Sequence, residues 1–428
     1  MNVALVGIGN MGLGWLGASL LRGHRVMAID KDPAKVRSLL DGSLLEGEEV
    51  IWKEIRAKCF DRLQASTRLQ DLRGAEVIFI AVQTPAPDGQ CDYGPLLNLL
   101  DALQKVLVPG QILLLGSTVF PGDIREKILP KIPPGVVFAY EPVFVRAGSG
   151  VTDYLHPGKV IVGVEDPDKP PRPLQEFFTS LTTGYPTGWC RFEEAEFIKL
   201  MHNTFMCVKI SFANEVATFC NRFSVNPRRI MELTFRESAR GRLLTFSHMV
   251  PGPPYSGTCL PKDSAVLMRM LDEIDGRHGG DFQTLRGAIQ SNEDQVDRLV
   301  NYLHKHAWAE GGVAGCVGLT YRPGYTDIRD SLFWTIRKRL AVRGPPVAFI
   351  GYDPVFAGLS KERYGLLCRQ NAELLAMYDE VTLSLEQVLE RSRVLIVNRP
   401  LTRVERVAVG RFDRPMLNLY EHFGGSDG

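Results

Sequence analysis

The first thirty residues constrain the fold of this chain most narrowly. A short apolar run, Val3-Ala4-Leu5-Val6, precedes the glycine loop Gly7-Ile8-Gly9-Asn10-Met11-Gly12, and a helix-like stretch follows as far as Leu21. A second apolar run, 26–29, ends at Asp30, which lies 23 positions after the first glycine. Strand, glycine loop, helix, strand and acid in this order are typical of the first βαβ unit of a dinucleotide-binding domain.

The residue types in this unit predict the cofactor. Glycines permit a tight turn and let a pyrophosphate approach the N-terminus of the helix. The expected contacts are Gly7, Gly9, Asn10, Met11 and Gly12. Asp30 would accept the ribose hydroxyls and repel a 2′-phosphate, so NAD is favoured over NADP, although Lys31 beside it weakens that repulsion.

Composition limits the other possibilities. A chain of 428 residues with 45% hydrophobic content can form two or three domains. Its 50 Lys and Arg residues balance 49 Asp and Glu, so we expect neither a nucleic acid nor a membrane surface as partner. The eight cysteines are scattered without metal-ligand spacing, which predicts no metal site. With no signal peptide or long apolar span, the sequence is typical of a reduced, cytoplasmic protein.

The first third of the chain continues to alternate strand and helix patterns. The apolar runs 76–82 and 111–115 predict buried strands of a parallel sheet. Thr84 lies in the loop after the first run and Thr118 in the loop 116–122 after the second. Ligands of open α/β sheets bind at the carboxyl ends of strands, so we expect both loops to face the cofactor, with an ordinary Pro/Gly turn as the alternative for the first.

The rest of the chain predicts a helix and a second sheet. Apolar residues recur at helical spacing from 193 to about 223 without a strong breaker, and Lys199 and Asn203 fall on one face. Further strands are expected at 313–319, 346–353 and 394–397, with a ligand-facing loop at 321–331. The predicted fold is therefore α/β, with two Rossmann-like doubly wound domains, 1–190 and 301–428, joined by a long central helix and a helical middle domain, 191–300.

The segment from Tyr255 to Asp263 carries a second chemical signal. It places Cys259 between a glycine and a Pro-Lys-Asp turn. A thiolate is the nucleophilic form of cysteine, and a nearby cation stabilises it. A single loop cysteine is more often a small buried residue. The glycine loop at the N-terminus favours the catalytic interpretation here.

Together these segments resemble the UDP-glucose/GDP-mannose dehydrogenase family, NAD-dependent oxidases of nucleotide sugars. The resemblance covers nearly the whole chain. It rests on the glycine loop, Gly-Ser-Thr-Val-Phe-Pro-Gly at 116–122, the helix with Lys199 and Asn203, the turn 259–263, and the stretch 318–331. In that family the cysteine adds to the aldehyde formed by the first hydride transfer. The thiohemiacetal loses a second hydride to become a thioester, and water releases the acid.

The resemblance implies a role for each matching residue. Cys259 would be the nucleophile, and Lys199 would stabilise the alkoxide and oxyanion. Asn203 would hold that oxygen or a water, Asp263 would orient water and support proton transfer, and Thr118 would contact the same water or the cofactor. The family's substrate positions correspond to Lys199, Asn203, Tyr255, Gly257 and Arg322, and its cofactor positions beyond the glycine loop to Thr84, Thr118, Lys262 and Arg329. It also implies a homodimer built around the long helix.

The chain departs from the family in two places. Val143 and Ala147 stand where the family has glutamates, the first of them its candidate base for the thioester step. Glu141 could replace that base only if the backbone shifts. Near the C-terminus, 398–401 replaces a Thr-Glu-Trp-like segment and 417–420 an Asp-x-Arg-like one. These changes leave the base and the sugar of the substrate open.

Three functions are compatible with these residues. The first is NAD-dependent oxidation of the C6 hydroxymethyl group of UDP-glucose or a relative to a uronic acid. In the second, the missing glutamates stop or divert the oxidation at the aldehyde or thioester. The third is a non-catalytic protein that binds NAD or a nucleotide sugar, which would need no nucleophile. A two-electron dehydrogenase of hydroxy acids fits less well, because it would need neither Cys259 nor a third domain.

Overall fold

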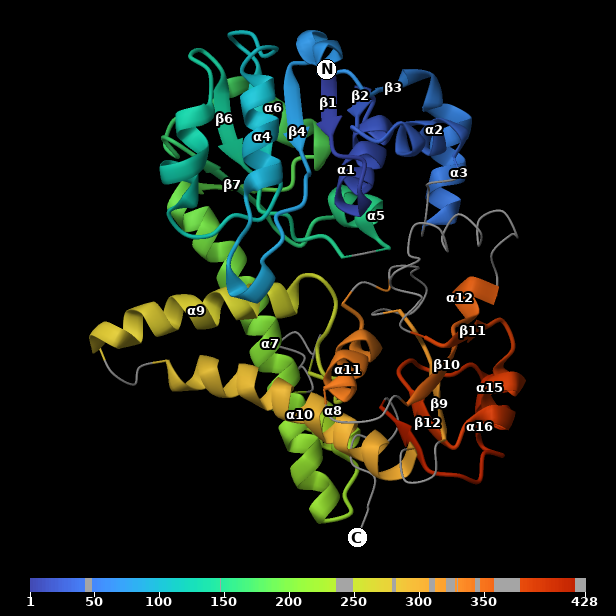
Figure 1. The fold of residues 1–428 in the computed structure, drawn as a ribbon. Helices are drawn as coiled ribbons and strands as arrows, with labels where there is room; N and C mark the ends of the chain where they lie inside the picture. Colours follow the sequence, from blue (N-terminus) through green and yellow to red (C-terminus); the bar gives the residue numbers. More distant parts are fainter. Residues whose placement is uncertain are drawn as a thin grey trace. The chain divides into compact units, whose positions relative to one another are not determined.

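The computed structural model describes residues 1–42, 48–146, 148–235, 249–278, 282–307, 312–320, 328, 330–342, 347–357 and 378–419. The chain divides into two compact units, Met1–His202 and Asn203–Gly428. The long helix α7 (Phe192–Arg222) runs through the division (Figure 1). Among the described residues no helix is long and apolar enough to cross a membrane.

The first unit is built on an eight-stranded sheet with the order β3-β2-β1-β4-β5-β6-β7-β8. Its strands are β1 (Asn2–Val6), β2 (Arg25–Ile29), β3 (Leu63–Ser66), β4 (Val77–Ile80), β5 (Ile112–Leu115), β6 (Val137–Tyr140), β7 (Val160–Val164) and β8 (Thr187–Arg191). All neighbouring pairs are parallel except β6 and β7. Because β1 lies between β2 and β4, the connections reverse direction there, which is where open α/β sheets bind ligands.

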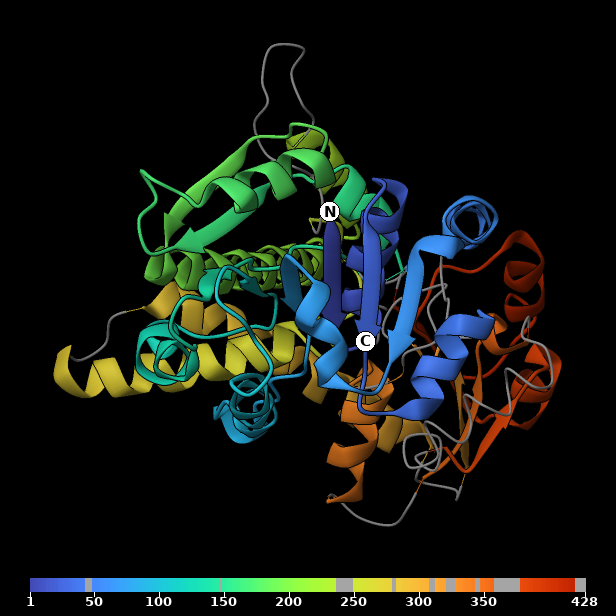
Figure 2. The same ribbon diagram turned by 90° about the horizontal axis from the view of Figure 1, so that it is seen from above.

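Helices cover both faces of this sheet (Figure 2). They are α1 (Asn10–Leu21), α2 (Pro33–Asp41), α3 (Glu49–Lys58), α4 (Gly94–Leu103), α5 (Gly150–Leu155) and α6 (Arg172–Leu181). Trp15 of α1 stacks on Phe79 of β4, with ring centroids 4.9 Å apart. A Cβ on Gly14 would lie 2.7 Å from the carbonyl carbon of Gly150, so α1 and α5 touch backbone to backbone. Only glycine fits such a crossing.

The second unit contains a five-stranded, all-parallel sheet with the order β11-β10-β9-β12-β13. Its strands are β9 (Val313–Val317), β10 (Ala348–Tyr352), β11 (Glu380–Thr382), β12 (Val394–Val397) and β13 (Met416–Asn418). Its helices besides α7 include α8 (Pro227–Thr234), α9 (Leu260–His278), α10 (Gln283–Ala307), α11 (Leu332–Ala341), α12 (Pro354–Ala357), α15 (Leu385–Arg391) and α16 (Arg403–Val409). Residues of α10 and α11 pack on one face of the sheet, and residues of α15 and α16 on the other.

The structure confirms the predicted fold class. The helix expected at 193–223 is α7, and the apolar runs of the first unit form β1, β2, β4 and β5. Three predicted strands end earlier than expected, because the last residues of 76–82, 313–319 and 346–353 turn into loops at the carboxyl edges of their sheets. The threefold domain division with borders at 190 and 300 stays a prediction.

Candidate active site

The glycine loop after β1 leaves space in front of α1. Gly7 has a φ of +101°, and a Cβ there would lie 2.6 Å from the Ala81 carbonyl oxygen. A Cβ on Gly12 would lie 2.5 Å from the carbonyl oxygen of Gly7. A Cβ on Gly9, in contrast, would meet no atom within 4 Å. The turn therefore needs Gly7 and Gly12 for its own closure, and Gly9 keeps the approach to the helix N-terminus open for a pyrophosphate.

Asp30 at the end of β2 holds the same loop from the other side. Its Oδ2 accepts a hydrogen bond of 2.8 Å from the Ile8 amide, and its Oδ1 accepts one of 3.0 Å from the Asp32 amide. Lys35 lies 3.6 Å from Oδ2, whereas Lys31 is exposed. Because each carboxylate oxygen can accept a second hydrogen bond, Asp30 retains capacity for ribose hydroxyls.

The two loops at the carboxyl ends of β4 and β5 are bonded to each other. The Val82 amide donates to Ser117 Oγ (3.1 Å), which donates back to the Val82 carbonyl (2.7 Å). The Thr84 hydroxyl donates to the Thr118 carbonyl at 2.8 Å. Thr84 is buried and Thr118 is half-buried. The loops predicted to face a cofactor thus form one connected edge beside the glycine loop.

A carboxylate that the sequence analysis did not identify fixes the second of these loops. Glu196 of α7 is fully buried and accepts hydrogen bonds of 2.9 Å from the amides of Gly122 and Ile124. Burial, with a further contribution from Asp123 and Glu193, raises the pKa of Glu196 to about 7 against the effect of the two amides. The sequence does contain a feature that could have identified Glu196. It is an acid on the apolar side of the predicted helix, one turn before Lys199.

Lys199 contacts the segment that follows β6. Its Nζ donates a hydrogen bond of 2.7 Å to the Val143 carbonyl and lies 5.3 Å from the ring centroid of Phe144. Lys159 approaches the same ring to 4.1 Å, and its Nζ lies 2.9 Å from Nδ1 of His202. Burial, followed by repulsion from Lys199, lowers the pKa of Lys159. Two ammonium groups are therefore concentrated around one aromatic ring.

In the second unit, Cys259 immediately precedes the first residue of α9. The cysteine is exposed, and its carbonyl accepts a hydrogen bond of 2.9 Å from the Asp263 amide. The Thr258 hydroxyl oxygen lies 3.7 Å from Sγ. The partial positive charge of a helix N-terminus favours anions. This position suits an accessible nucleophile that passes through an anionic form.

Asp263 links the cysteine turn to α7. The carboxylate is buried, and its Oδ2 accepts a hydrogen bond of 2.5 Å from Nδ2 of Asn203. Lys262 Nζ lies 2.8 Å from the other carboxylate oxygen. The structure thus brings Asn203, Cys259, Lys262 and Asp263 together within the second unit, and Lys199 precedes Asn203 by one turn of α7.

The remaining predicted residues have different surroundings. Tyr255 is buried, with its hydroxyl beside the thiol of Cys207, whose pKa burial raises to about 12. Gly257 has a φ of +83°, and its amide donates to the Asp330 carbonyl at 2.6 Å. Arg322, Arg329 and Ala147, together with most of the loop 321–331, lie outside the described residues.

Comparison with known proteins decides the family. Residues 1–182 match the NAD binding domain of the UDP-glucose/GDP-mannose dehydrogenase family, and residues 193–294 match its central domain. The chain belongs to this family. It is 29% identical over 382 residues to the UDP-glucose 6-dehydrogenase AglM of Haloferax volcanii, covering 85% of this chain and 86% of the relative. It is 28% identical over 378 residues to the UDP-glucose 6-dehydrogenase YwqF of Bacillus subtilis, covering 84% and 81%.

Solved structures share the fold of the chain. A UDP-glucose dehydrogenase from Pyrobaculum islandicum superimposes with a TM-score of 0.77 at 22% identity, covering 99% of this chain and 95% of that one. A UDP-D-ManNAc dehydrogenase from Pyrococcus horikoshii superimposes with a TM-score of 0.77 at 21% sequence identity. The match covers 100% of this chain and 97% of that one. The chain is therefore an NAD-dependent nucleotide-sugar dehydrogenase, with NAD as its cofactor. The open space at Gly9 and the free acceptor capacity of Asp30 fit that cofactor.

The first departure from the family pattern lies beside Lys199. Val143 is buried, and Lys199 binds its backbone carbonyl oxygen. Glu141 is buried near Tyr154, and its Oε2 has no hydrogen-bond partner among the residues that the structure describes. Burial raises the pKa of Glu141 to about 8. The raised pKa favours the protonated form of Glu141, and that form cannot accept a proton as a general base.

The second departure places a buried cation after β12. Arg399 forms an ion pair with Glu405, and both side chains are more than nine-tenths buried. The Arg399 side chain also covers Gly318, since a Cβ there would lie 3.0 Å from its Cγ. The charge of Arg399 is balanced within the protein.

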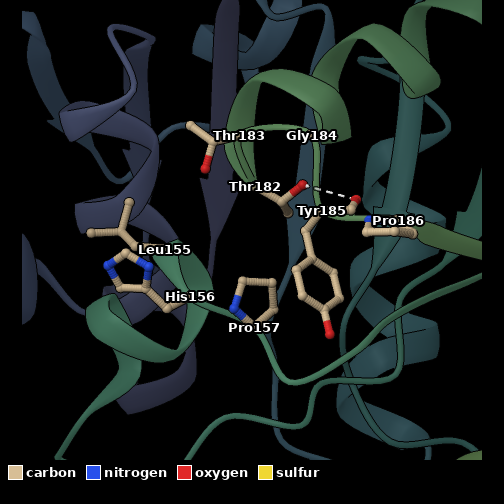
Figure 3. A pocket seen from close by; sticks show the side chains of 8 residues that line it. All are labelled: Leu155, His156, Pro157, Thr182, Thr183, Gly184, Tyr185 and Pro186. Atoms are coloured by element: carbon tan, nitrogen blue, oxygen red, sulfur yellow. Dashed lines mark hydrogen bonds between the residues drawn. The ribbon is translucent and has the colours of Figure 1, made fainter.

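An open hollow of about 460 Å³ in the first unit lies apart from these residues. It is lined by 155–157 after α5 and 182–186 after α6, with the Thr182 hydroxyl directed at the Tyr185 carbonyl (Figure 3). Arg22, just after the C-terminal end of α1, donates to the carbonyls of Leu155 and Leu181 beside it. The glycine loop lies at the opposite end of α1, about 18 Å away. The hollow therefore contributes nothing to the candidate site.

Proposed function

We propose that the chain oxidises the C6 hydroxymethyl group of UDP-glucose, or of a close relative, to a uronic acid through a covalent intermediate on Cys259. The observation that carries this proposal is the exposed thiol at the start of α9, one turn from a buried Asp263 that is bonded to Asn203. The H. volcanii and B. subtilis relatives are named for UDP-glucose, which supports this substrate. When bound, NAD would supply the hydride acceptor, with a fresh molecule for each of the two oxidations.

Each proposed step uses a group of the chain. The C6 hydroxyl gives its proton to solvent, the ammonium of Lys199 stabilises the resulting alkoxide, and C6 loses the first hydride to become the aldehyde carbon. Sγ of Cys259 then bonds to the aldehyde carbon while the carbonyl oxygen gains a proton. Loss of that proton and of a second hydride gives the thioester. Water held by Asp263 and Asn203 adds to the thioester carbon, and the C–S bond breaks to return the thiol and release the acid.

The other predicted contacts belong to the same proposal. Cofactor contacts are assigned to the glycine loop, Asp30, Lys31, Thr84, Thr118, Lys262 and Arg329. Substrate contacts are assigned to Lys199, Asn203, Tyr255, Gly257 and Arg322. Support comes from the connected loop edge at Thr84 and Thr118 and from the cysteine turn that follows Tyr255 and Gly257.

A screen of sugar nucleotides tests the function directly. NADH formation is followed over a panel of UDP- and GDP-sugars, and the products are identified by mass spectrometry. We expect two NADH per uronic acid with a UDP-hexose. A panel that yields neither NADH nor acid would contradict the proposal.

The nucleophile has its own test. Cys259→Ser should abolish acid formation and leave NAD binding intact, because a serine hydroxyl is a far weaker nucleophile at neutral pH. Cys190→Ser, at a half-buried thiol on β8, is the matched control and should turn over normally. Full turnover by the Cys259 variant would remove this residue from the mechanism.

Val143 favours a second candidate outcome, a slow or diverted release of the thioester. A positioned base accelerates such a step typically by 10² to 10⁴, and Val143 cannot supply one. We expect a burst of NADH and an adduct on Cys259, visible by intact-protein mass spectrometry. Val143→Glu should shorten the lifetime of the adduct, whereas Val145→Glu should not. Steady turnover without burst or adduct would show that another base serves.

We further propose that two copies of the chain associate through α7. Phe205, Phe212 and Phe219 repeat every seven residues along the helix and are 54%, 46% and 64% exposed, with Phe223 beside them at 64%. A stripe with this period is typical of helix-to-helix association. Light scattering should give a dimer for the wild type and a monomer for Phe219→Glu. A wild-type monomer at micromolar concentration would exclude this interface.

A further inference from the structure

Two buried carboxamides hold the backbone that leads to Cys259. Asn214 of α7 is fully buried, and its Oδ1 accepts a hydrogen bond of 2.9 Å from the Gly252 amide. Asn292 of α10 is 3% exposed, and its Oδ1 accepts from the Tyr255 amide at 2.8 Å while its Nδ2 donates to the Tyr255 carbonyl at 3.3 Å. One side chain thus satisfies both polar groups of one backbone residue, as a neighbouring strand would.

The carboxamides are fixed in turn. Nδ2 of Asn214 donates to Oε1 of Gln295 at 2.8 Å, and Gln295 lies one turn after Asn292 on α10. The Ser211 hydroxyl, one turn before Asn214, donates to the Ala288 carbonyl at 2.5 Å. Asparagine hydrogen bonds with both donor and acceptor used define a single orientation of the amide. Helices α7 and α10 therefore present these groups rigidly to the segment 252–255.

Cys259 lies midway between two such anchors. Tyr255, held by Asn292, is four residues before it, and Asp263, held by Asn203, is four residues after it. Pro253 and Pro254 restrict the backbone within the first anchor. The thiol is exposed, yet the chain on both sides of it is tied to buried polar groups. Reacting groups held in this way approach their target with little loss of orientational freedom.

We propose that Asn292 is a positioning residue for Cys259. Its carboxamide fixes the backbone at Tyr255, and through it the direction from which Sγ meets the aldehyde carbon. Asn214 supports the same segment at Gly252. This inference rests on the proposed role of Cys259 as nucleophile. Removing the carboxamide should lower the rate of the cysteine's reactions. NAD affinity should not change, because the glycine loop belongs to the first unit and Lys262, the assigned cofactor contact of α9, is paired with Asp263, which the substitution leaves in place.

The experiment compares three variants of the full chain. Asn292→Ala removes both hydrogen bonds, and Asn292→Asp keeps the acceptor and can donate only when protonated. Asn301→Asp, at an exposed position of the same helix, controls for the added charge. Alkylation of Cys259 by iodoacetamide is measured by peptide mass spectrometry, with half-buried Cys91 and Cys190 as internal references. The values of kcat, KM and the NAD dissociation constant are measured in parallel.

We expect Asn292→Ala to lower kcat by about 10- to 100-fold. Alkylation of Cys259 should fall relative to the reference thiols, with NAD affinity unchanged. Asn292→Asp should regain kcat relative to wild type as pH is lowered, because its protonated carboxyl group can replace the amide, whereas the alanine variant should show no such gain. If Asn292→Ala does not fold, the pH series of Asn292→Asp decides.

Two results would overturn the inference. One is a folded Asn292→Ala variant with wild-type kcat and wild-type alkylation of Cys259. The other is an Asn292→Asp variant whose kcat relative to wild type does not depend on pH. Failure of the nucleophile itself has a separate signature, full turnover by Cys259→Ser, so the two hypotheses are distinguished.

Discussion

The two Rossmann-like sheets share a glycine turn and an acid in the same geometry. Gly7 and Gly318 follow the middle strands β1 and β9 with φ angles of +101° and +91°. Asp30 and Asp353, after β2 and β10, each accept a hydrogen bond from the amide directly after that glycine, at 2.8 and 2.9 Å. The strand orders β3-β2-β1-β4-β5 and β11-β10-β9-β12-β13 correspond as well.

The sheets differ in what lies beside the turn. In the first, Gly9 leaves the turn open toward α1, and its counterpart in the second is Thr320. After β12, Arg399 covers Gly318 and pairs with Glu405. The acid therefore holds the glycine turn in both sheets and does not by itself mark a dinucleotide site. Open space at Gly9 is a feature of the turn in the first sheet, which belongs to the NAD binding domain.

The largest effect should come from removing the Arg399 side chain, which covers Gly318 in the second sheet. Arg399→Ala leaves Glu405 buried without its cation, which should cost about 3–5 kcal/mol in the free energy of unfolding. Urea unfolding measures this cost. Arg403→Ala, at an exposed position of α16, is the control and should stay within about 0.5 kcal/mol of wild type. Equal costs for both variants would contradict the role given to the buried Arg399–Glu405 pair beside Gly318.

Valine substitutions at Gly9 and at its counterpart Thr320 should have different effects on NAD affinity. Gly9 has an extended backbone (φ −117°, ψ 177°) that valine can adopt, so Gly9→Val should fold normally and obstruct the pyrophosphate. We expect NAD to bind about 30- to 100-fold more weakly, equivalent to about 2–3 kcal/mol of steric cost. Thr320→Val at the counterpart should leave NAD affinity unchanged. Calorimetric titration of both variants checks this, and equal losses would refute the assignment.

The last effect concerns pH and the strands β6, β7 and β8 of the first sheet. Glu141 follows β6, and burial raises its pKa from 4.5 to about 8, so the folded state keeps its proton longer than the unfolded state. Its contribution to stability is complete below pH 4.5 and is lost as pH rises to about 8. Within that window, the free energy of unfolding of the wild type should fall by about 1.4 kcal/mol per pH unit relative to that of Glu141→Gln.

Urea unfolding at pH 5, 6 and 7 measures this difference. Glu76→Gln, at an exposed carboxylate of the same unit, should follow wild type at every pH. A constant difference between wild type and Glu141→Gln across the window would show that Glu141 is not the titrating group.

The sequence predicted the elements whose signal is local. Runs such as 112–115 are buried on both faces of a parallel sheet, so every residue is apolar and the pattern is unambiguous. The edge strand β8, Thr187–Arg191, escaped notice because its residues are half-buried or exposed and mix polar and apolar types. A strand that is stabilised mainly by pairing with its neighbour need not show a clear hydrophobic pattern in its own sequence.

The same limit applies to the site. Cys259, Asp263, Lys199 and Asn203 are recognised from motif spacing along one turn or one helix. Glu196 and Asn292, in contrast, bind backbone amides from segments 72 and 37 residues away. Almost every residue has a backbone amide, so the residue type of such a partner gives no sequence signal. Only the folded structure reveals these contacts.

The contact between Gly14 and Gly150 has a consequence for attempts to re-engineer the cofactor preference. Gly14 lies about 6 Å along α1 from the end that faces the pyrophosphate. A single methyl group at either glycine would push the helix axes apart, and the amide donors at the start of α1 would move with them. Libraries that aim to change cofactor choice should therefore keep both positions invariant, although neither of them contacts the ligand in the proposed arrangement.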